Sequence, residues 1–457
     1  MQTNLIPLYQ DSSQGQRAEE ILRSCVHCGF CNATCPTYQV LGDELDGPRG
    51  RIYQIKQLLE GGEVSDHTRE HLDRCLSCRA CETTCPSGVQ YHELLDIGKQ
   101  ALDQKLPRKK RERLLRSLVH AWLIRPKLFS ISMRLGRWLR SAVPFLLPAA
   151  IKSKVVEREK VELPNIFRPD RHAVLEAEEK REQKQGRGVL LVFDACVQDA
   201  ITPQVNQATK IVFESLGFSL EFIGESSVCC GALSQHTDQQ VLAKQKARQN
   251  IDAWMGRIST TGAQAIIATA SGCGVFIKDY PELFDVSDPY FAKAQQIAKL
   301  CKDPVELFSN DEERAGRVRG EDLCSALRAC ISSTVMQGGE HDSGAHDILA
   351  YHPPCTLQHG QKLQGAVEAL FERLSFPLLV PDDAHLCCGS AGTYSLLQPK
   401  LSSQLQENKL QRLNKLEPTV VLSANIGCQA HLASKSEVPV VHWLQYLAQM
   451  LTSSTKL

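Results

Sequence analysis

The sequence predicts a multidomain α+β fold in which a helical N-terminal domain is followed by two copies of a cysteine-rich α/β domain. Eight cysteines lie in the first hundred residues, with helical patterns between them. From Gly188 onward, short β-branched runs alternate with helical patterns, and this order occurs twice. The 457 residues also exceed what one hydrophobic core usually serves. The predicted segments are a helical domain at 1–100, a basic helical linker at 101–185, repeat one at 186–330, a second linker at 331–347 and repeat two at 348–457.

Composition narrows the class of protein. The 52 Lys and Arg residues balance 52 Asp and Glu residues, which gives no support to a nucleic-acid partner. The sequence has no signal-peptide pattern and no run of roughly 18 apolar residues, so we expect a cytoplasmic protein. Nineteen cysteines in such a chain indicate metal ligation, because cytosolic thiols are kept reduced.

The helical domain contains one cysteine run twice. The run has the spacing C-x2-C-x2-C-x3-C-P, and each member of the second copy lies 50 positions after its counterpart. Between the copies, residues 47–62 carry apolar residues at helical spacing, bounded by Gly-Pro and Gly-Gly. This pattern predicts two metal-binding loops separated by a helix.

The repeated run is typical of a ferredoxin-type domain with two [4Fe–4S] clusters. In two-cluster ferredoxins, three closely spaced cysteines bind one cluster and the fourth ligates the other. The predicted ligands are therefore Cys25, Cys28, Cys31 and Cys85 for cluster one, and Cys75, Cys78, Cys81 and Cys35 for cluster two. The alternative is a pair of four-cysteine zinc sites, which would need neither the third cysteine of each run nor the Cys-Pro ending.

Residues 101–160 lack cysteine and are strongly basic, with 16 Lys and Arg against 4 Asp and Glu. The apolar residues among these charges include Trp122, Phe129, Trp138 and Phe145. A basic amphipathic helix can lie on an anionic membrane or contact a partner protein. A solvated helix that packs on its own domain is an equally good interpretation.

The C-terminal region repeats its cysteines at a nearly constant offset. Cys355, Cys387 and Cys428 follow Cys196, Cys229 and Cys273 by 159, 158 and 155 positions, which indicates two copies of one unit. Each unit has a cysteine at a predicted strand end, a Cys-Cys-Gly turn and a later cysteine that ends another predicted strand. Strand ends are the usual place for a site in α/β units. The two candidate metal or redox sets are Cys196, Cys229, Cys230 and Cys273, and Cys355, Cys387, Cys388 and Cys428.

Other residues near these sets are ambiguous. A structural role for the paired cysteines is the alternative to a metal site. Nearby histidines are either further ligands or ordinary polar groups, namely His236, His352, His359 and His431. Cys301, Cys324 and Cys330 follow no pattern and are interpreted as ordinary thiols. Arg49 and Arg51, after the first cysteine run, either stabilise a reduced cluster or a partner carboxylate, or lie at a solvated helix start.

The sequence has no G-x-G-x-x-G fingerprint, P-loop or G-x-S-x-G elbow. By these motifs the chain offers no flavin or nicotinamide site, so electrons must come from elsewhere. The sequence also resembles one family over nearly its full length, the iron–sulfur subunits of bacterial glycolate oxidases. The resemblance depends on the two cysteine runs and on the segments TASGCGVFIKDY, PPCTLQHGQKL, HLCCGSAGTY and ANIGCQAHLAS.

The cysteine-rich repeat is also similar to that of anaerobic glycerol-3-phosphate dehydrogenase and heterodisulfide-reductase-type subunits. The fuller pattern of the latter type ends in C-x2-C. Here Ala270 and Asn425 stand at the first of those two positions, which argues against additional clusters of that special type.

The resemblance implies a non-catalytic electron-transfer subunit with two [4Fe–4S] clusters. In such complexes a flavin-containing subunit oxidises glycolate to glyoxylate, and the iron–sulfur subunit passes electrons toward the membrane quinone pool. A peripheral position at the inner face of the cytoplasmic membrane follows. One alternative is a catalytic subunit that reduces a disulfide or quinone in another 2-hydroxyacid or glycerol-3-phosphate dehydrogenase complex. The other is an assembly scaffold with structural clusters.

Overall fold

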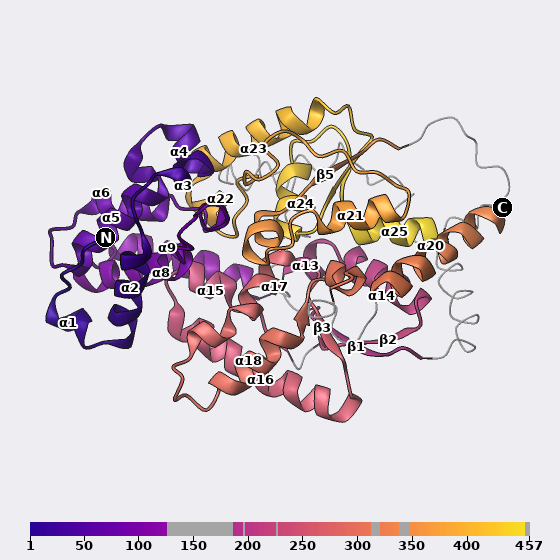
Figure 1. Cartoon of the computed structure of the whole chain (residues 1–457), viewed down its shortest axis with the longest axis horizontal. Helices are drawn as coiled ribbons and strands as arrows, with labels where there is room; N and C mark the ends of the chain where they lie inside the picture. Colours follow the sequence, from indigo (N-terminus) through magenta and orange to yellow (C-terminus); the bar gives the residue numbers. More distant parts are fainter. Residues whose placement is uncertain (126–185, 195–196, 225–226, 312–319, 338–346, 453–457) are drawn as a thin grey trace, which may run out of the picture.

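The computed structural model describes residues 1–125, 186–194, 197–224, 227–311, 320–337 and 347–452. These residues form a helical N-terminal domain beside two α/β units, each built around a parallel sheet (Figure 1). This arrangement confirms the predicted multidomain α+β fold. Within the described residues, no helix combines the length and the apolar composition needed to cross a membrane.

The N-terminal domain consists of short helices around one apolar core. Helix α5 begins at Pro48, whose fixed φ suits a first helical turn, and ends at Leu59 before Gly61 adopts a φ of +89°. Its buried Ile55 packs closely on Gly98, where a Cβ atom would lie only 2.6 Å from the Ile55 side chain. The predicted helical spacer is confirmed. The helices are α1 (Pro7–Gln10), α2 (Ser13–Ser24), α3 (Phe30–Ala33), α4 (Pro36–Leu41), η1 (Glu44–Asp46), α5 (Pro48–Leu59), α6 (Asp66–Asp73), α7 (Ala80–Thr83) and α8 (Tyr91–Lys105).

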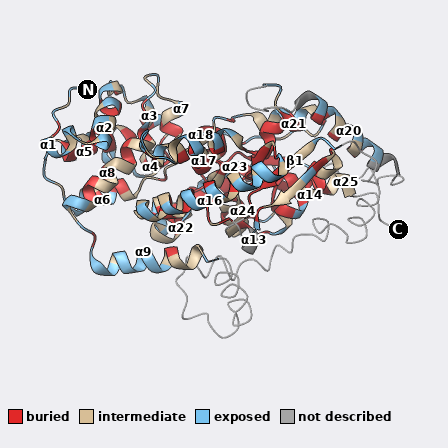
Figure 2. Ribbon diagram, turned by 90° about the horizontal axis from the view of Figure 1, so that it is seen from below, coloured by how far each residue is buried: buried red, intermediate tan, exposed pale blue. Residues whose placement is uncertain are grey.

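Helix α9 (Lys110–Leu123) lies within the predicted basic linker. Its Arg116 and His120 are buried, and His120 is hydrogen-bonded to Ser234 of repeat one at 2.9 Å. The opposite face is open to solvent, since Leu114 and Leu118 are each 60% exposed (Figure 2). The rest of the predicted linker lies outside the described residues, including Phe129, Trp138 and Phe145.

Repeat one contains a four-stranded parallel sheet in the order β2-β1-β3-β4. Adjacent Leu190 and Leu191 of β1 are both fully buried and belong to different apolar cores, one on each face of the sheet. This double burial explains the continuous apolar runs in the sequence. The strands are β1 (Gly188–Val192), β2 (Phe218–Phe222), β3 (Ala265–Ile267) and β4 (Cys301–Lys302), and the aligned pairs include Gly188 with Phe218, Leu190 with Ala265 and Ile266 with Cys301.

Helices cover both faces of this sheet. Helices α14 and α20 pack on one face, and α16, α17 and α18 pack on the other. The described helical segments are α13 (Val197–Ile201), α14 (Gln204–Ser215), α15 (Ala232–His236), α16 (Gln240–Thr261), α17 (Ser271–Lys278), η6 (Tyr280–Leu283), α18 (Phe291–Leu300), η7 (Pro304–Phe308) and α20 (Gly320–Gln337).

Repeat two contains a parallel sheet in the order β5-β6-β7. Leu379 forms an additional parallel bridge to Ala350 of β5, in the place that β2 has beside β1. The strands are β5 (Leu349–His352), β6 (Val420–Ser423) and β7 (Val440–His442), and the aligned pairs include Leu349 with Val420 and Val421 with Val440. The helical segments are η8 (Thr356–Gly360), α21 (Ala366–Arg373), α22 (Tyr394–Leu397), α23 (Pro399–Asn414), α24 (Ile426–Ala433) and α25 (Trp443–Thr452).

The two repeats share one apolar core and meet at the carboxyl ends of their strands. Helix α14 of repeat one packs on α25 of repeat two. After β3, the Ser271 amide donates to the carbonyl of Ala424 at 3.2 Å, and the Ser271 hydroxyl lies 2.7 Å from that of Thr356. The strand ends, where sites are expected in α/β units, therefore face each other.

The N-terminal domain contacts both repeats (Figure 1). Its second cysteine loop is attached to repeat one by ion pairs and to repeat two by hydrogen bonds. These contacts place the cysteine loop beside the strand ends of the repeats. They are Arg79 with Asp279, His92 with Glu282 at 3.1 Å, Thr83 with His359 at 2.9 Å, and the Tyr394 hydroxyl with the Arg74 carbonyl at 3.2 Å.

Candidate iron–sulfur and metal sites

The two N-terminal cysteine loops have the same backbone geometry. Left-handed residues occur at His27 and Gly29 in the first loop, with φ of 57° and 87°, and at Ser77 and Arg79 in the second, with φ of 51° and 60°. The positions correspond across the 50-residue offset. Left-handed backbone is costly for residues other than glycine, so its recurrence shows that both loops are shaped in the same way.

The four cysteines predicted for cluster one line a single small cavity, together with Cys81 of the other predicted set. Cys25 follows the end of α2, and Cys85 comes from the second run. Burial raises the pKa of the Cys31 thiol to about 11, with further contributions from Cys25, Cys85 and Cys28. Cys28 is exposed to solvent, so this end of the domain is open to a partner.

The cysteines predicted for cluster two line another cavity, formed by Cys35, Cys75, Cys78 and Cys81. Burial raises the pKa of the Cys78 and Cys81 thiols well above the ordinary range. The Ser77 amide lies 3.4 Å and the Tyr91 hydroxyl 3.7 Å from Sγ of Cys75. Because iron binds the thiolate, cluster assembly at these buried thiols must release protons. Donors close to a ligating sulfur also adjust the potential of a cluster.

A buried charge network lies directly behind the cysteines predicted for cluster two. Arg51 is 1% exposed, and its Nε donates to the carbonyl of His71 at 2.7 Å. Its guanidinium lies 3.2 Å from the hydroxyl of Thr37 and 3.4 Å from the carboxylate of Asp46. Asp46 is also paired with Arg74 at 2.9 Å. The interpretation of Arg51 as part of a solvated helix start is therefore wrong.

Arg49 has a different position from Arg51. Its guanidinium pairs with Glu44 at 2.6 Å and lies against Gly29 in the first cysteine loop. The side chain is 36% exposed. Arg49 is thus a surface charge beside the first cysteine loop, whereas Arg51 is a buried charge beside the cysteines predicted for cluster two.

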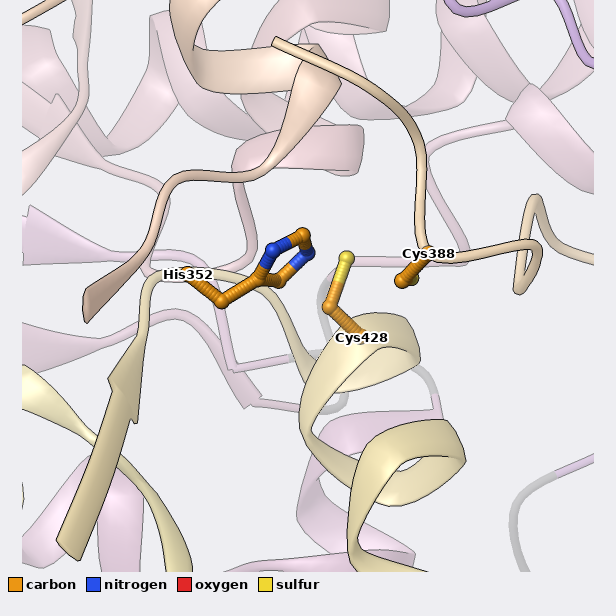
Figure 3. A group of neighbouring side chains, drawn as sticks. All are labelled: His352, Cys388 and Cys428. Atoms are coloured by element: carbon orange, nitrogen blue, oxygen red, sulfur yellow. The ribbon is translucent and has the colours of Figure 1, made fainter. Parts of the chain in front are cut away.

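The four cysteines of repeat two gather at the strand ends. The Sγ atoms of Cys355 and Cys387 lie 3.9 Å apart. Two thiolates about 2.3 Å from one tetrahedral metal lie roughly 3.8 Å from each other, so this spacing suits metal ligation. Cys388 and Cys428 form a second group with His352, in which the ligand atoms lie within 4.8 Å of one another (Figure 3).

His352 differs from the other histidines singled out in the sequence. It is fully buried, and neither ring nitrogen has a hydrogen-bond partner among the described residues. Burial, with Lys409 and His431 nearby, lowers the pKa of His352 well below its usual range. His359, in contrast, uses both nitrogens, which lie 2.9 Å from the Thr83 hydroxyl and 2.9 Å from the carbonyl of His385.

The remaining two histidines have other surroundings. His431 Nε2 lies 3.3 Å from the hydroxyl of Ser402. His236 lines a large cavity between the domain and the repeats. Neither belongs to the group formed by Cys388, Cys428 and His352.

Repeat one brings together the three candidate cysteines that the structure describes. Cys229 and Cys273, and then burial, raise the pKa of the Cys230 thiol well above the ordinary range. Cys196, the fourth member of the predicted set, lies outside the described residues. Tyr280 fixes the turn, since its hydroxyl donates to the carbonyl of Cys230 at 2.8 Å.

The sequence predicts that the last cysteine of each repeat ends a strand, and this prediction is wrong. Cys273 lies in the first turn of α17 and Cys428 in the first turn of α24, because β3 and β6 end several residues earlier. Asn425, at the position of the first cysteine in the C-x2-C pattern, donates to Sγ of Cys428 at 3.6 Å. Its side-chain oxygen accepts a hydrogen bond from the Gly272 amide at 3.3 Å. Asn425 therefore connects the two repeats.

A cavity of about 880 Å³ joins the three cysteine groups. Cys78 of the N-terminal domain, Cys230 of repeat one and Cys387 of repeat two all contribute to its lining. Cys78 also packs in the small apolar cluster that contains Cys355 and Cys387. The second cysteine loop of the N-terminal domain thus contacts the cysteines of repeat two.

Sequence reasoning missed Lys409 in this region. Its helix, α23, looks like a solvated surface helix in the sequence, yet Lys409 is 2% exposed. Its Nζ donates to the carbonyl of Asp383 at 3.0 Å, and burial lowers its pKa to about 8. A lysine at helical spacing among polar residues gives no signal of such burial.

The cysteines without a pattern are packed as ordinary thiols. Cys301 is fully buried, with Sγ 3.9 Å from the Gly274 carbonyl. Cys324 lies in the core shared by the two repeats, and Sγ of Cys330 donates to the carbonyl of Ser215 at 3.7 Å. None of the three lines the cavities described above.

Comparison with known proteins agrees with this architecture. The family model of the 4Fe-4S dicluster domain matches residues 21–89, and that of the cysteine-rich domain matches residues 190–278 and 349–433. The chain is similar to lactate utilization protein A of Bacillus velezensis, with 25% identity over 57% of this chain and 98% of that protein. It is 26% identical to the probable glycolate oxidase iron–sulfur subunit of Bacillus subtilis, over 92% of this chain and 90% of the relative.

A stronger similarity connects the chain with a relative from Escherichia coli. The glycolate oxidase iron–sulfur subunit of that organism is 44% identical over 451 residues, which cover 99% of both chains. Such similarity over the full length includes the N-terminal domain and both repeats. The chain therefore belongs to the family of glycolate oxidase iron–sulfur subunits.

Proposed function

We propose that the chain is the electron-transfer subunit of a glycolate oxidase complex and does not itself oxidise the substrate. A flavin-containing partner would supply electrons from glycolate, and the membrane quinone pool would receive them. The observation that carries the proposal is the spatial order of the cysteines, from the exposed Cys28 to the half-buried Cys78 and on to the buried Cys387. This order gives electrons a path from the surface of the N-terminal domain to the interior of the molecule.

The proposal assigns two [4Fe–4S] clusters to the N-terminal domain, with the crossed ligand sets predicted from the sequence. Thiolates are the protein ligands of such clusters, and the clusters supply one-electron storage and transfer. Each small cavity is lined by three cysteines of one run and by the fourth cysteine of the other, and Cys81 also reaches the first cavity. The presence of cysteines from both runs in each cavity supports the crossed assignment. Burial and nearby donors at the cluster-two cysteines give the chain the means to adjust a potential.

The face around cluster one is proposed as the docking site for the flavin-containing subunit. Val26 and Phe30 flank Cys28 in the first loop and are 67% and 62% exposed. Exposed apolar residues beside a redox site are typical of a protein interface. Electrons must pass from the flavin to a nearby cluster. The exposed loop around Cys28 is therefore the part of the chain that fits this partner.

The proposed position of the protein is the inner face of the cytoplasmic membrane, with α9 as the contact. Leu114, Leu115 and Leu118 are each more than half exposed on one face of α9. Lys110 and Arg111 near the start of the helix are exposed as well. An apolar stripe flanked by basic residues matches the charge and chemistry of an anionic lipid surface.

The function can be tested in the assembled complex with Cys81→Ser. We expect glycolate-dependent reduction of a quinone analogue to fall at least tenfold. Reduction of a dye that takes electrons directly from the flavin should continue. The matched control is Cys330→Ser, which changes a thiol outside the cavities. Quinone reduction at the wild-type rate in Cys81→Ser would overturn the proposal.

A second candidate function is reduction of a disulfide or quinone at the repeats themselves. The cavity of about 880 Å³, lined by thiols of both repeats, favours this candidate. A double Cys387→Ser, Cys388→Ser variant distinguishes the two. If dye reduction by the clusters continues while the physiological acceptor is no longer reduced, the repeats are the terminal site. Unchanged reduction of that acceptor would eliminate the second candidate.

A further inference from the structure

We propose that repeat two holds an iron centre in which His352 is a ligand together with Cys388 and Cys428. The three residues come from three separate segments: His352 ends β5, Cys388 lies in the Cys-Cys-Gly turn, and Cys428 lies in the first turn of α24 (Figure 3). Their ligand atoms lie within 4.8 Å of one another. The exposed fractions of the residues are 0%, 1% and 4%.

The two ring nitrogens of His352 are the second observation that indicates a ligand. A buried imidazole normally forms hydrogen bonds, because burial of an unsatisfied polar group is unfavourable. Neither nitrogen of His352 has a partner among the described residues. Figure 3 shows its ring directed toward the sulfur of Cys428. A metal ion between the imidazole and the thiolates would satisfy this otherwise unexplained group.

Repeat one lacks this nitrogen donor. The residue that corresponds to His352 at the 159-residue offset is Phe193. Its buried ring packs edge-on against Trp254, with the two ring centroids 5.5 Å apart. A phenyl ring has no atom that ligates a metal. The two repeats are therefore chemically different although they share a fold, and the mixed imidazole and thiolate site belongs to repeat two.

The surroundings of the site stabilise its sulfur ligands. The side-chain amide of Asn425 donates a hydrogen bond to Sγ of Cys428 at 3.6 Å. The side-chain oxygen of Asn425 accepts a hydrogen bond from the Gly272 amide. Next to Cys388, the Cys387 thiol accepts a hydrogen bond from the Gly389 amide at 3.4 Å and lies 3.9 Å from Sγ of Cys355. Outer hydrogen bonds of this kind orient ligands and adjust the metal.

Iron, rather than zinc, follows from the neighbourhood of the site. Cys78, a predicted ligand of cluster two, packs against Cys355 and Cys387 in one small cluster. A redox-inert ion would serve no purpose at the end of an electron path. Replacement of thiolate by imidazole raises the potential of an iron–sulfur centre. The site would thus accept one electron from reduced cluster two, so that Fe³⁺ becomes Fe²⁺ while cluster two is oxidised by one electron and no bond or proton is transferred.

This inference depends on the proposed function for its electron source, but its test does not. The full chain is purified anaerobically as wild type and as His352→Phe, which reproduces the residue of repeat one. Iron and zinc per chain are measured, together with nitrogen hyperfine coupling by pulsed electron paramagnetic resonance. The wild type should contain iron beyond the roughly eight atoms of two [4Fe–4S] clusters, with a coupled imidazole nitrogen.

In His352→Phe, the nitrogen coupling should disappear and the additional iron should fall by at least half, while the cubane signals remain. Cys428→Ser should also lose the additional iron. His442→Gln is the matched control, because His442 is a buried histidine of the same repeat whose Nε2 already bonds to the carbonyl of Thr269 at 3.0 Å. This control should keep the coupling in its folded fraction.

Several outcomes would overturn the inference. They are no metal beyond the two cubanes, zinc in place of the additional iron, or nitrogen coupling that persists in His352→Phe. A wild-type protein without cubane signals would instead contradict the proposed function. The two failures are therefore distinguishable in one set of samples.

Discussion

The guanidinium of Arg51 lies 3.2 Å from the hydroxyl of Thr37, and this hydroxyl lies 3.3 Å from Sγ of Cys35. A buried positive charge is thus connected through one side chain to a predicted ligand of cluster two. Reduction of a cluster adds negative charge, so a nearby buried cation favours the reduced state. The arrangement explains why an arginine occupies the interior of a small helical domain.

We expect Arg51→Gln to lower the midpoint potential of cluster two by about 50 mV or more, since roughly 1.4 kcal/mol corresponds to 59 mV for one electron. Arg51→Lys should keep most of the potential because it keeps the charge. Asp46 should stay paired with Arg74 in both variants, because Arg74 already contacts its carboxylate at 2.9 Å. A redox titration followed by electron paramagnetic resonance measures the shift. Arg49→Gln is the control, and an unchanged potential in Arg51→Gln would contradict the assigned role.

The joint between the N-terminal domain and repeat one should weaken as pH rises. Burial lowers the pKa of His92, but its hydrogen bonds to Glu282 and Glu82 outweigh burial and raise that pKa to about 10. The unfolded value is about 6.5. Because the folded pKa is the higher one, the stabilisation is complete below about pH 6.5 and is lost as pH rises toward 10, with a slope of up to about 1.4 kcal/mol per pH unit.

Thermal unfolding of the anaerobic protein between pH 6.5 and 10 measures this dependence. His92→Gln should flatten the decline, while Arg79 and Asp279 beside it continue to pair. His67→Asn changes an exposed histidine and should leave the decline as it is in the wild type. A wild-type slope in His92→Gln would show that other groups cause the pH dependence.

Phe30→Asp should weaken binding of the flavin-containing subunit about tenfold, because it places a charge in an apolar contact. Titration of the purified partner against the iron–sulfur subunit measures the dissociation constant. Val286→Asp is the control, since Val286 is 81% exposed and lies in repeat one. Equal affinities for the two variants would place the interface elsewhere.

A Leu114→Glu, Leu118→Glu double variant should lose binding to vesicles that contain anionic lipid. The wild type should bind such vesicles and release them at high salt, because the basic residues contribute by screened attraction. Sedimentation with anionic and with neutral vesicles measures both effects. Val241→Glu, at an 86% exposed apolar residue of repeat one, is the control. If the double variant binds anionic vesicles as well as the wild type, this face of α9 is not the membrane contact.

The sequence predicts those features that depend on local spacing. The cysteine runs, the helix that begins at Pro48 and the alternation of strands with helices are local patterns, and the structure contains the helix and the alternation where they are expected. The 50-residue offset also anticipates the shared loop geometry of His27 and Ser77.

Features that depend on packing between distant segments are not visible in the sequence. Arg51 and Lys409 look like solvated helix residues, and only tertiary contacts make them buried. The lack of partners at His352 likewise emerges when β5, the Cys-Cys-Gly turn and α24 meet. Cys428 moves from a strand end to a helix because β6 stops at Ser423.

Iron and acid-labile sulfide per chain, measured on anaerobically purified protein together with electron paramagnetic resonance of the reduced form, test the electron-transfer function most directly. We expect at least about eight irons and a coupled signal from two reduced [4Fe–4S] clusters. The Cys25→Ser and Cys75→Ser variants should each lose one of the two signals. Stoichiometric zinc without reducible iron would contradict the account.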